Sequence, residues 1–248
     1  MYDWPEVREA TDALWAGISR RLGVALPLDR RADHISTWRE PGLLFSQTCG
    51  YPFTHEFRGK LKLVATPHYG VEGCDGPGYC SFIMARERQP LEALRGSRAA
   101  VNNRDSMSGM LALKLVFAPL AAHGQFFGEV IETGGHLRSL AAVRDGKADV
   151  CATDAVCVAL ARRYRPDELA GLVEIARSPM VPALPYVTHS NDRRRLQEAL
   201  AGAFSDQTLS DARDGLFLTG FSVLECEAYD RITEIETEME KAGGLKLL

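Results

Sequence analysis

Short apolar runs alternate with helical runs through the middle of this chain, and each apolar run ends in a polar loop. The alternation is clearest over residues 98–122, 126–145 and 148–164, which predict, among other elements, a strand at 126–132 and a helix at 155–164. Parallel strands cannot be joined by a tight turn and need a crossover of about a dozen residues, usually a helix. The pattern therefore favours an α/β fold with mostly parallel sheets and helices on both faces.

The first of these strand-to-helix junctions carries Ser106, Ser108 and Gly109. An apolar run ending at Val101 precedes it, and a strongly apolar helical run follows at 111–118. The first backbone N–H groups of a helix lack partners within it, and the helix dipole adds positive potential there. Such a helix start binds an oxyanion without lysine or arginine. Serines that only cap their own helix would produce the same pattern.

Two further junctions follow, Gly134-Gly135-His136 and Thr153-Asp154. In open parallel sheets ligands bind beside the carboxyl ends of the strands. A neutral His136 can donate from one ring nitrogen, and Asp154 can accept from a protonated oxygen or an ammonium group. Both residues also suit simple helix capping. Taken with Ser106 and Ser108, they predict a site for a small oxyanion.

The stretches 76–80 and 178–187 carry glycine or proline and are interpreted as crossovers between two lobes. On this interpretation residues 1–77 and 186–248 form lobe 1, and residues 78–185 form lobe 2 with the helix-start anion site. A ligand would then lie in the cleft between the lobes, which is a preferred location for small-molecule sites.

Composition and missing motifs exclude several classes of function. A net charge of −4 gives no nucleic-acid footprint, and no apolar run reaches the roughly 18 residues of a membrane span. The start of the chain shows no signal peptide, so the sequence as written predicts a cytoplasmic location, or a periplasmic one if the start is truncated. Phosphate-binding, hydrolase and zinc-protease motifs are absent, and no cofactor is predicted.

The six cysteines form no Cys-x-x-Cys pair, which fits a reduced compartment. A disulfide between Cys74 and Cys80 stays open as an alternative.

Five segments together resemble the PhnD-like phosphonate and phosphate-binding components of ABC importers, a group of type II periplasmic binding proteins. The resemblance covers roughly residues 2 to 235. The segments are S-Q-T-C-G-Y-P (46–52), S-M-S-G (106–109), T-G-G-H (133–136), A-D-V-C-A-T-D (148–154) and P-A-L-P-Y-V-T (182–188).

The resemblance implies a solute-binding protein rather than an enzyme, which closes two hinged lobes over phosphate, phosphite or a phosphonate. Its implied partner is an ABC permease, and its implied state is a monomer or a weak dimer. The ligand contacts carried over from the family are Tyr51, Tyr79, Ser106, Ser108, His136 and Asp154. Met107 stands where many relatives have a small hydroxylated residue, so this position is expected to alter ligand preference.

The beginning of the chain departs from the family pattern. The type II fold usually opens with a strand, whereas residues 5–22 already read as the first helix. We therefore expect either that the start is assigned too late or that lobe 1 lacks its first strand.

Two other functions compete with solute binding. A cytosolic enzyme or sensor on the same fold could act on a small cofactor precursor, with Cys49 as nucleophile and His136 facing it. A metal could alternatively be bound by His68, Cys74 and Cys80, although their spacing matches no common zinc pattern.

Overall fold

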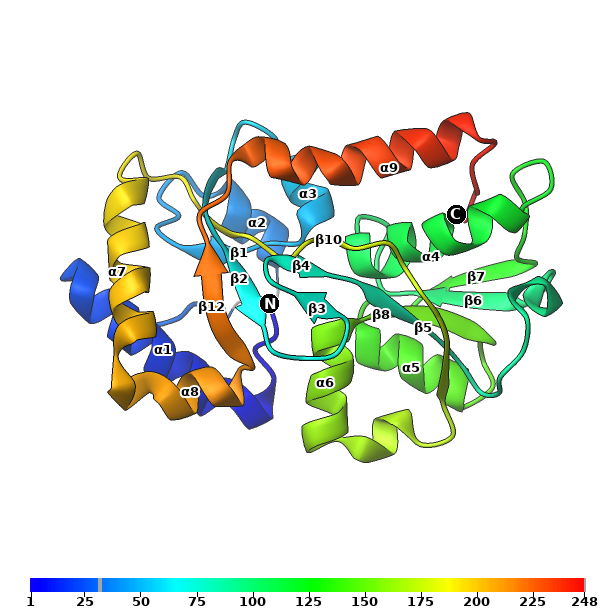
Figure 1. Ribbon diagram of the computed structural model, residues 1–248, viewed down its shortest axis with the longest axis horizontal. Coiled ribbons are helices and arrows are strands. Elements are labelled where there is room, and N and C mark those ends of the chain that lie inside the picture. The colour runs from blue at the N-terminus through cyan, green and yellow to red at the C-terminus, as the bar shows by residue number, and fades with distance from the viewer. Residues whose placement is uncertain (31–32, 248) are drawn as a thin grey trace. The chain divides into compact units, whose positions relative to one another are not determined.

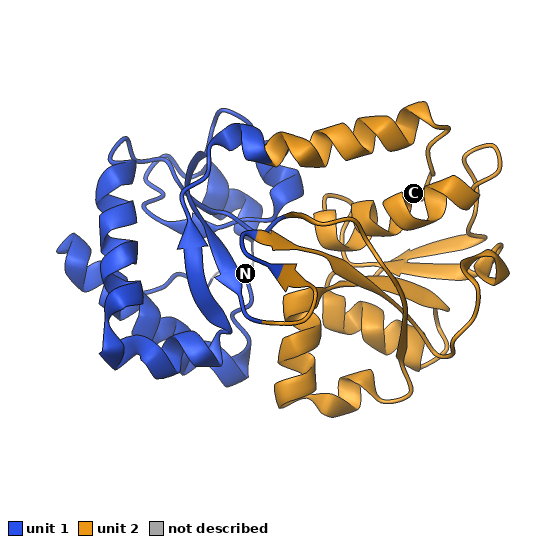
Figure 2. Ribbon diagram, in the orientation of Figure 1, with its two compact units in different colours: residues 1–70, 75–77, 182–228 blue, residues 71–74, 78–181, 229–248 orange. Residues whose placement is uncertain are grey.

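The computed structural model describes residues 1–30 and 33–247, which form two compact units. Figure 2 colours the two units separately. Unit 1 contains residues 1–70, 75–77 and 182–228, and unit 2 contains residues 71–74, 78–181 and 229–248. The sequence placed 229–248 with the first lobe, whereas in the structure this segment clusters with unit 2.

Unit 1 is built on a four-stranded sheet in the order β1-β11-β2-β12. Each neighbouring pair in it is antiparallel. The longest strand is β2, whose central residues Leu63 to Ala65 are fully buried. The strands are β1 (Ser46–Gln47), β2 (Lys62–Tyr69), β11 (Tyr186–Thr188) and β12 (Leu218–Ser222).

The helices of unit 1 pack on this sheet and on one another. α1 contacts α7 and α8, and α7 contacts β2. Gly23 ends α1 in the left-handed conformation, with φ 64°, which a glycine adopts without steric cost. The bounds are α1 (Arg8–Leu22), α2 (His34–Arg39), α3 (Gly50–Thr54), α7 (Arg193–Ser205) and α8 (Ser210–Gly215), with short turns at Pro5–Val7 and Gln207–Leu209.

A cavity of about 490 Å³ in unit 1 borders β1 and is rich in aromatic side chains, including Trp15, Phe45 and Tyr186. β1 pairs with β11 on one side, and no described strand pairs with its other side. One of the two expectations from the sequence was that lobe 1 lacks its first strand. That expectation concerns this sheet, in which β1 is an edge strand.

Unit 2 contains a five-stranded sheet in the order β7-β6-β8-β5-β9. β6 is parallel to β7 and to β8, whereas β5 is antiparallel to both of its neighbours. The strands are β5 (Ser81–Ala85), β6 (Arg98–Val101), β7 (Glu129–Glu132), β8 (Val150–Asp154) and β9 (Val173–Arg177).

Helices cover both faces of the unit 2 sheet, with α4 on one side and α5 and α6 on the other (Figure 1). Phe82 and Met84 of β5 share one core cluster with Leu140 and Val143 of α5. The bounds are α4 (Ala112–Phe117), α5 (His136–Arg144), α6 (Ala155–Tyr164) and α9 (Asp230–Lys241), with short turns at Leu91–Leu94, Met107–Leu111, Ala118–Leu120 and Pro166–Leu169. The short turn Cys226–Tyr229 leads from unit 1 into α9.

The carboxyl-terminal segment joins unit 2 through α9 and the residues after it. α9 runs alongside α4 (Figure 1), and Ile232, Ile235 and Met239 form its buried stripe. The Lys246 N–H donates to the Gly124 carbonyl at 2.9 Å. A narrow apolar stripe in the sequence shows that a helix is packed, but not which element it packs against. The sequence therefore assigned residues 229–248 to lobe 1, whereas the structure assigns them to unit 2.

A third, small sheet has the order β10-β4-β3. It is formed by β3 (Cys74–Asp75), β4 (Gly78–Tyr79) and β10 (Val181–Pro182), which lie in the two segments that join the units along the chain. None of the described helices is long and apolar enough to span a bilayer.

The predicted α/β class is confirmed, with one correction. The sheets are not mostly parallel: the unit 1 sheet is antiparallel throughout, and the unit 2 sheet is mixed because β5 runs against both of its neighbours. Apolar runs indicate strands but carry no information on direction, which depends on how the connecting segments bring a strand back into the sheet.

Candidate functional site

The predicted junctions lie at one edge of the unit 2 sheet. β6, β7 and β8 are parallel in register, so their carboxyl ends share that edge. β5 runs the other way, and its first residue Ser81 pairs with Asp154, the last residue of β8. The structure therefore groups the Ser106 turn, the His136 junction and Asp154 along the carboxyl edge of this sheet.

The Ser106 turn begins a helix that continues from Met107 through α4 to Leu120. The Ser106 hydroxyl accepts a hydrogen bond from the Gly109 N–H at 3.0 Å, and the Ser106 carbonyl accepts from the Leu111 N–H at 2.9 Å. The second bond spans five residues, which makes the first turn a wide π turn, a feature frequent at functional sites. Ser106 is a helix cap whose own hydroxyl proton stays available.

Ser108 is buried and faces His136 rather than its own backbone. Its Oγ lies 2.9 Å from Nε2 of His136, and Nδ2 of Asn102 lies 3.4 Å from the same nitrogen. The first two predicted junctions are thus joined through side chains. Their backbones are also joined, because the Gly134 N–H donates to the Asn102 carbonyl at 2.7 Å.

His136 begins α5, after Gly134 in the left-handed conformation with φ 80°. Burial lowers the pKa of His136 to about 4, although the Ala152 backbone favours the protonated form. The imidazole is therefore neutral at physiological pH, with one donor and one acceptor nitrogen. Nδ1 of the ring is buried and has no hydrogen-bond partner within the described residues. A charged imidazolium is not part of this site.

Asp154 is 1% exposed and caps α6. Its Oδ1 accepts from the N–H groups of Val156 at 2.8 Å and Cys157 at 3.2 Å. The structure thus shows the capping role that the sequence held as an alternative. A carboxylate has about four acceptor positions, so the cap does not exhaust its capacity.

The other predicted contacts are placed as follows. Tyr79 ends β4 and is 1% exposed. Met107 is also 1% exposed, so its side chain lies within the protein and not on an open surface. Tyr51 belongs to α3 of unit 1, where its ring stacks on that of His55 at 3.8 Å between centroids. The ligand contacts of these three residues stay predictions.

The metal-binding alternative gains no support from the described residues. No three of their His, Cys, Asp or Glu side chains are grouped to hold a metal, and Nε2 of His68 instead meets Ser222 Oγ at 2.8 Å. Cys74 and Cys80 are free thiols. Burial, with the nearby Asp154 charge, raises the pKa of Cys74 to about 12, and burial also raises the pKa of Cys80. These thiols are protonated and poor nucleophiles.

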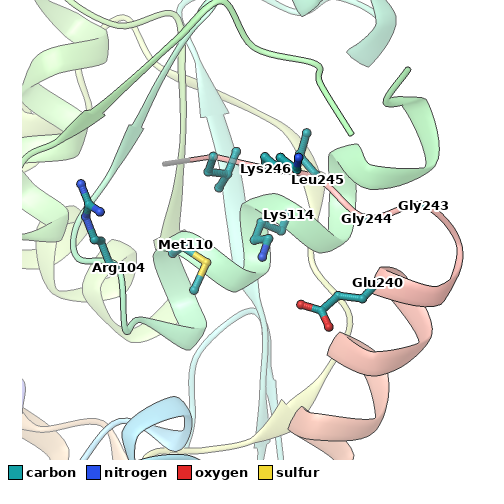
Figure 3. Close-up of a pocket in the computed structure, with 9 residues that line it drawn as sticks. Arg104, Met110, Lys114, Glu240, Gly243, Gly244, Leu245 and Lys246 are labelled. Carbon is teal, nitrogen blue, oxygen red and sulfur yellow. The ribbon is translucent and has the colours of Figure 1, made fainter. Parts of the chain in front are cut away.

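A separate cavity of about 420 Å³ lies in unit 2 (Figure 3). Arg104, Lys114 and Lys246 line it together with Glu240, and Leu245 and Leu247 of the tail also line it. Arg104 is engaged by Glu132 at 3.1 Å. The cavity contains none of the predicted ligand residues, and its charged groups have both signs.

The sequence did not reveal the role of Asn102, which directly follows the apolar run ending at Val101 but was assigned no function. Its side chain is 8% exposed and reaches both the helix start and His136. A signal was present, since a polar residue directly after a buried strand needs a hydrogen-bond partner. Which partner it finds depends on the neighbouring strand.

Comparison with protein-family models finds a match over residues 43–229 to the periplasmic phosphonate substrate-binding proteins of ABC transporters. A direct comparison with curated protein sequences finds no match.

Solved structures with the same fold include three informative neighbours. PhnD1 from Prochlorococcus marinus in complex with methylphosphonate has TM-score 0.73 and 15% identity, covering 95% of this chain and 94% of that one. A binding component of an ABC phosphonate transporter from Pseudomonas aeruginosa has TM-score 0.75 and 16% identity, covering 94% and 83%. A Xanthomonas citri protein bound to ATP has TM-score 0.67 and 20% identity, covering 96% and 94%.

Proposed function

Because this chain belongs to the family of periplasmic phosphonate substrate-binding proteins of ABC transporters, we propose that its unit 2 edge binds a small phosphonate, phosphite or phosphate ion. The observation that carries the proposal is the Ser106 helix start with Ser108 held against neutral His136. The family consists of transport proteins and not of enzymes, and it works in the periplasm.

The chemistry of this edge suits an oxyanion. The helix start provides backbone N–H donors and positive potential, and the Ser106 hydroxyl adds a donor. No positive charge is required, because neutral dipoles held in place by the fold stabilise an anion without reorganising. Asp154 supplies an acceptor, which favours a ligand with a protonated oxygen or an amine.

The proposal also includes further ligand contacts, a partner protein and an oligomeric state. Tyr51, Tyr79 and Met107 are proposed as further ligand contacts, with Met107 biasing the choice among anions. An ABC permease is the proposed partner, and the proposed state in solution is a monomer or weak dimer, which sedimentation velocity with and without ligand would test.

Thermal unfolding with methylphosphonate, 2-aminoethylphosphonate, phosphite and phosphate tests the proposal. A ligand at a hundredfold excess over its Kd should stabilise the protein by about 2.7 kcal/mol. If none of the four ions changes the unfolding temperature, the anion-binding proposal fails.

Ser106→Ala then tests the site itself. Loss of a hydrogen bond to a charged ligand should weaken binding by about 1.5–3 kcal/mol. The matched control is Asp192→Ala, which removes the cap of α7 in unit 1, where Asp192 accepts from the Arg195 N–H at 3.2 Å. Both variants lose a cap, but only Ser106→Ala should lose affinity. If the two variants bind the ligand with equal affinity, Ser106 only caps its helix and does not contact the ligand.

A further inference from the structure

Asn102 occupies a central position at the carboxyl edge of the unit 2 sheet. It follows Val101 of β6, and its carbonyl accepts from the Gly134 N–H. Its side chain lies over Gly109, where a Cβ atom would come within 1.8 Å of Oδ1. Oδ1 is buried and makes no hydrogen bond within the described residues. Because it lies along an α-hydrogen of Gly109, a weak C–H contact is what it receives there.

The other end of the amide decides the hydrogen bonding of His136. Nδ2 of Asn102 is 3.4 Å from Nε2, and an amide NH2 can only donate. The opposite amide orientation would bury two unsatisfied N–H donors over Gly109. The orientation found leaves the Oδ1 carbonyl and the Nδ1–H of His136 without partners among the described residues, so it has one unsatisfied donor fewer. Nε2 is therefore the acceptor of the neutral ring, and its single proton is on Nδ1.

This tautomer determines what Ser108 offers to a ligand. With Nε2 as acceptor 2.9 Å away, the Ser108 hydroxyl donates its only proton to His136. The remaining lone pairs of Oγ can then only accept. In the opposite tautomer Nε2 would donate to Oγ and release the hydroxyl proton for an anion.

We propose that Asn102 is a positioning residue that holds His136 as the Nδ1–H tautomer, so that Ser108 accepts a hydrogen bond from the ligand and selects an oxyanion that carries a proton. The inference rests on the proposed anion site and names the property by which that site discriminates. A hydrogen phosphonate has a P–OH group to donate to Ser108. A sulfonate of the same shape has none and would place lone pairs against lone pairs.

The imidazole ¹⁵N chemical shifts of the wild-type protein test the tautomer directly, with the His136 signals identified by their loss in His136→Gln. We expect the pattern of a neutral ring protonated at Nδ1. A ring protonated at Nε2 overturns the proposal, whether or not any phosphonate binds, so this outcome is distinct from failure of the proposed function.

Asn102→Asp tests the positioning role. A carboxylate can only accept, so it should convert His136 to a form protonated at Nε2 and turn Ser108 into a donor. The ratio of methylphosphonate to methanesulfonate affinity should then fall by about tenfold, as expected for one reversed hydrogen bond. Asn103→Asp, the same change at the half-buried next residue, adds the same charge and should leave both the spectrum and the ratio unchanged.

Two results of this second test would contradict the proposal. One is a changed His136 tautomer in Asn102→Asp with an unchanged affinity ratio. The other is an equal fall of the ratio in Asn103→Asp, which would assign the effect to charge alone. If Asn102→Asp does not fold, the wild-type ¹⁵N spectrum still decides the tautomer.

Discussion

The two ends of the unit 2 sheet carry polar groups of different kinds. At the amino end Asp149 meets Arg86 at 2.8 Å and Arg98 at 3.2 Å, and Arg98 also donates to the Gly146 carbonyl. At the carboxyl end Ser106, Ser108, Asn102 and His136 are neutral. Opposite charges satisfy each other at the first end, whereas these four residues at the second end are polar without charge and lie on the same edge as the Asp154 carboxylate.

The contrast suggests different roles for the two ends of the sheet: the amino end stabilises the fold, and the carboxyl end is suited to bind a ligand. An ion pair with both partners present offers little to a ligand. A neutral helix start keeps donors oriented, and it pays no desolvation cost for a fixed charge. We therefore expect substitutions at the amino end to change mainly the free energy of unfolding, and those at the carboxyl end to change mainly ligand affinity.

The largest effect is expected from Gly109→Ala. The new Cβ would lie 1.8 Å from Oδ1 of Asn102, so either the helix start or the amide must move. Overpacking of this kind costs about 1–3 kcal/mol of stability, and displacement of the helix start should abolish measurable methylphosphonate binding. Calorimetric titration and thermal unfolding measure the two effects. Gly42→Ala, where no atom lies within 4 Å of the new Cβ, is the control and should bind normally.

Ser108→Ala should weaken binding by about 1.5–3 kcal/mol while changing stability less. Its control is Ser97→Ala, the same substitution just before the amino end of β6, at a half-buried position. Calorimetric titration of both variants with methylphosphonate compares the two ends of one strand. Comparable losses of affinity in Ser108→Ala and Ser97→Ala would contradict the distinction between a binding end and a stabilising end of the sheet.

Asp149→Asn should lower the free energy of unfolding at pH 7 by about 1–2 kcal/mol, after allowance for the partial exposure of its arginine partners. Burial alone would raise the pKa of Asp149, but hydrogen bonds from Arg98 and Arg86 lower it to about 2. Since the folded value is below the unfolded one, the contribution is complete above about pH 4 and disappears as the pH falls toward 2. Urea unfolding across this range should show the difference between wild type and variant vanish in acid. Phosphonate affinity at pH 7 should be unchanged.

Asp154→Asn is expected to have the smallest effect on stability, a few tenths of a kcal/mol, because asparagine is also a good helix cap. If Asp154 also accepts a proton from the ligand, 2-aminoethylphosphonate should lose more affinity than phosphite, which titrations with both ligands would show. Asp154→Ala, which removes the cap, should cost about 1 kcal/mol of stability. Equal stability of the two variants would mean that the cap contributes nothing.

The pattern of apolar and capping residues predicted many of the helices and strands, because the formation of each element depends mainly on residues close together in the chain. The helix expected at 155–164 is found as Ala155–Tyr164, since Asp154 and Pro166 mark its two ends. The strand expected at 126–132 was too long, because β7 contains only Glu129–Glu132. Phe126 and Phe127 form an aromatic cluster with Phe117, which is a contact that strand periodicity cannot distinguish from sheet pairing.

Residue patterns were enough to predict the α/β class, the two-lobed family, and Ser106, Ser108 and His136 as polar groups at strand ends. Those features follow from residue spacing and capping chemistry, which act over a few residues. The folded chain was needed to show that Ser108 points to His136, that Asn102 lies between Gly109 and His136, and that α9 joins unit 2. These depend on which strands become neighbours in the sheet, and that arrangement is a property of the packed core and not of any local segment.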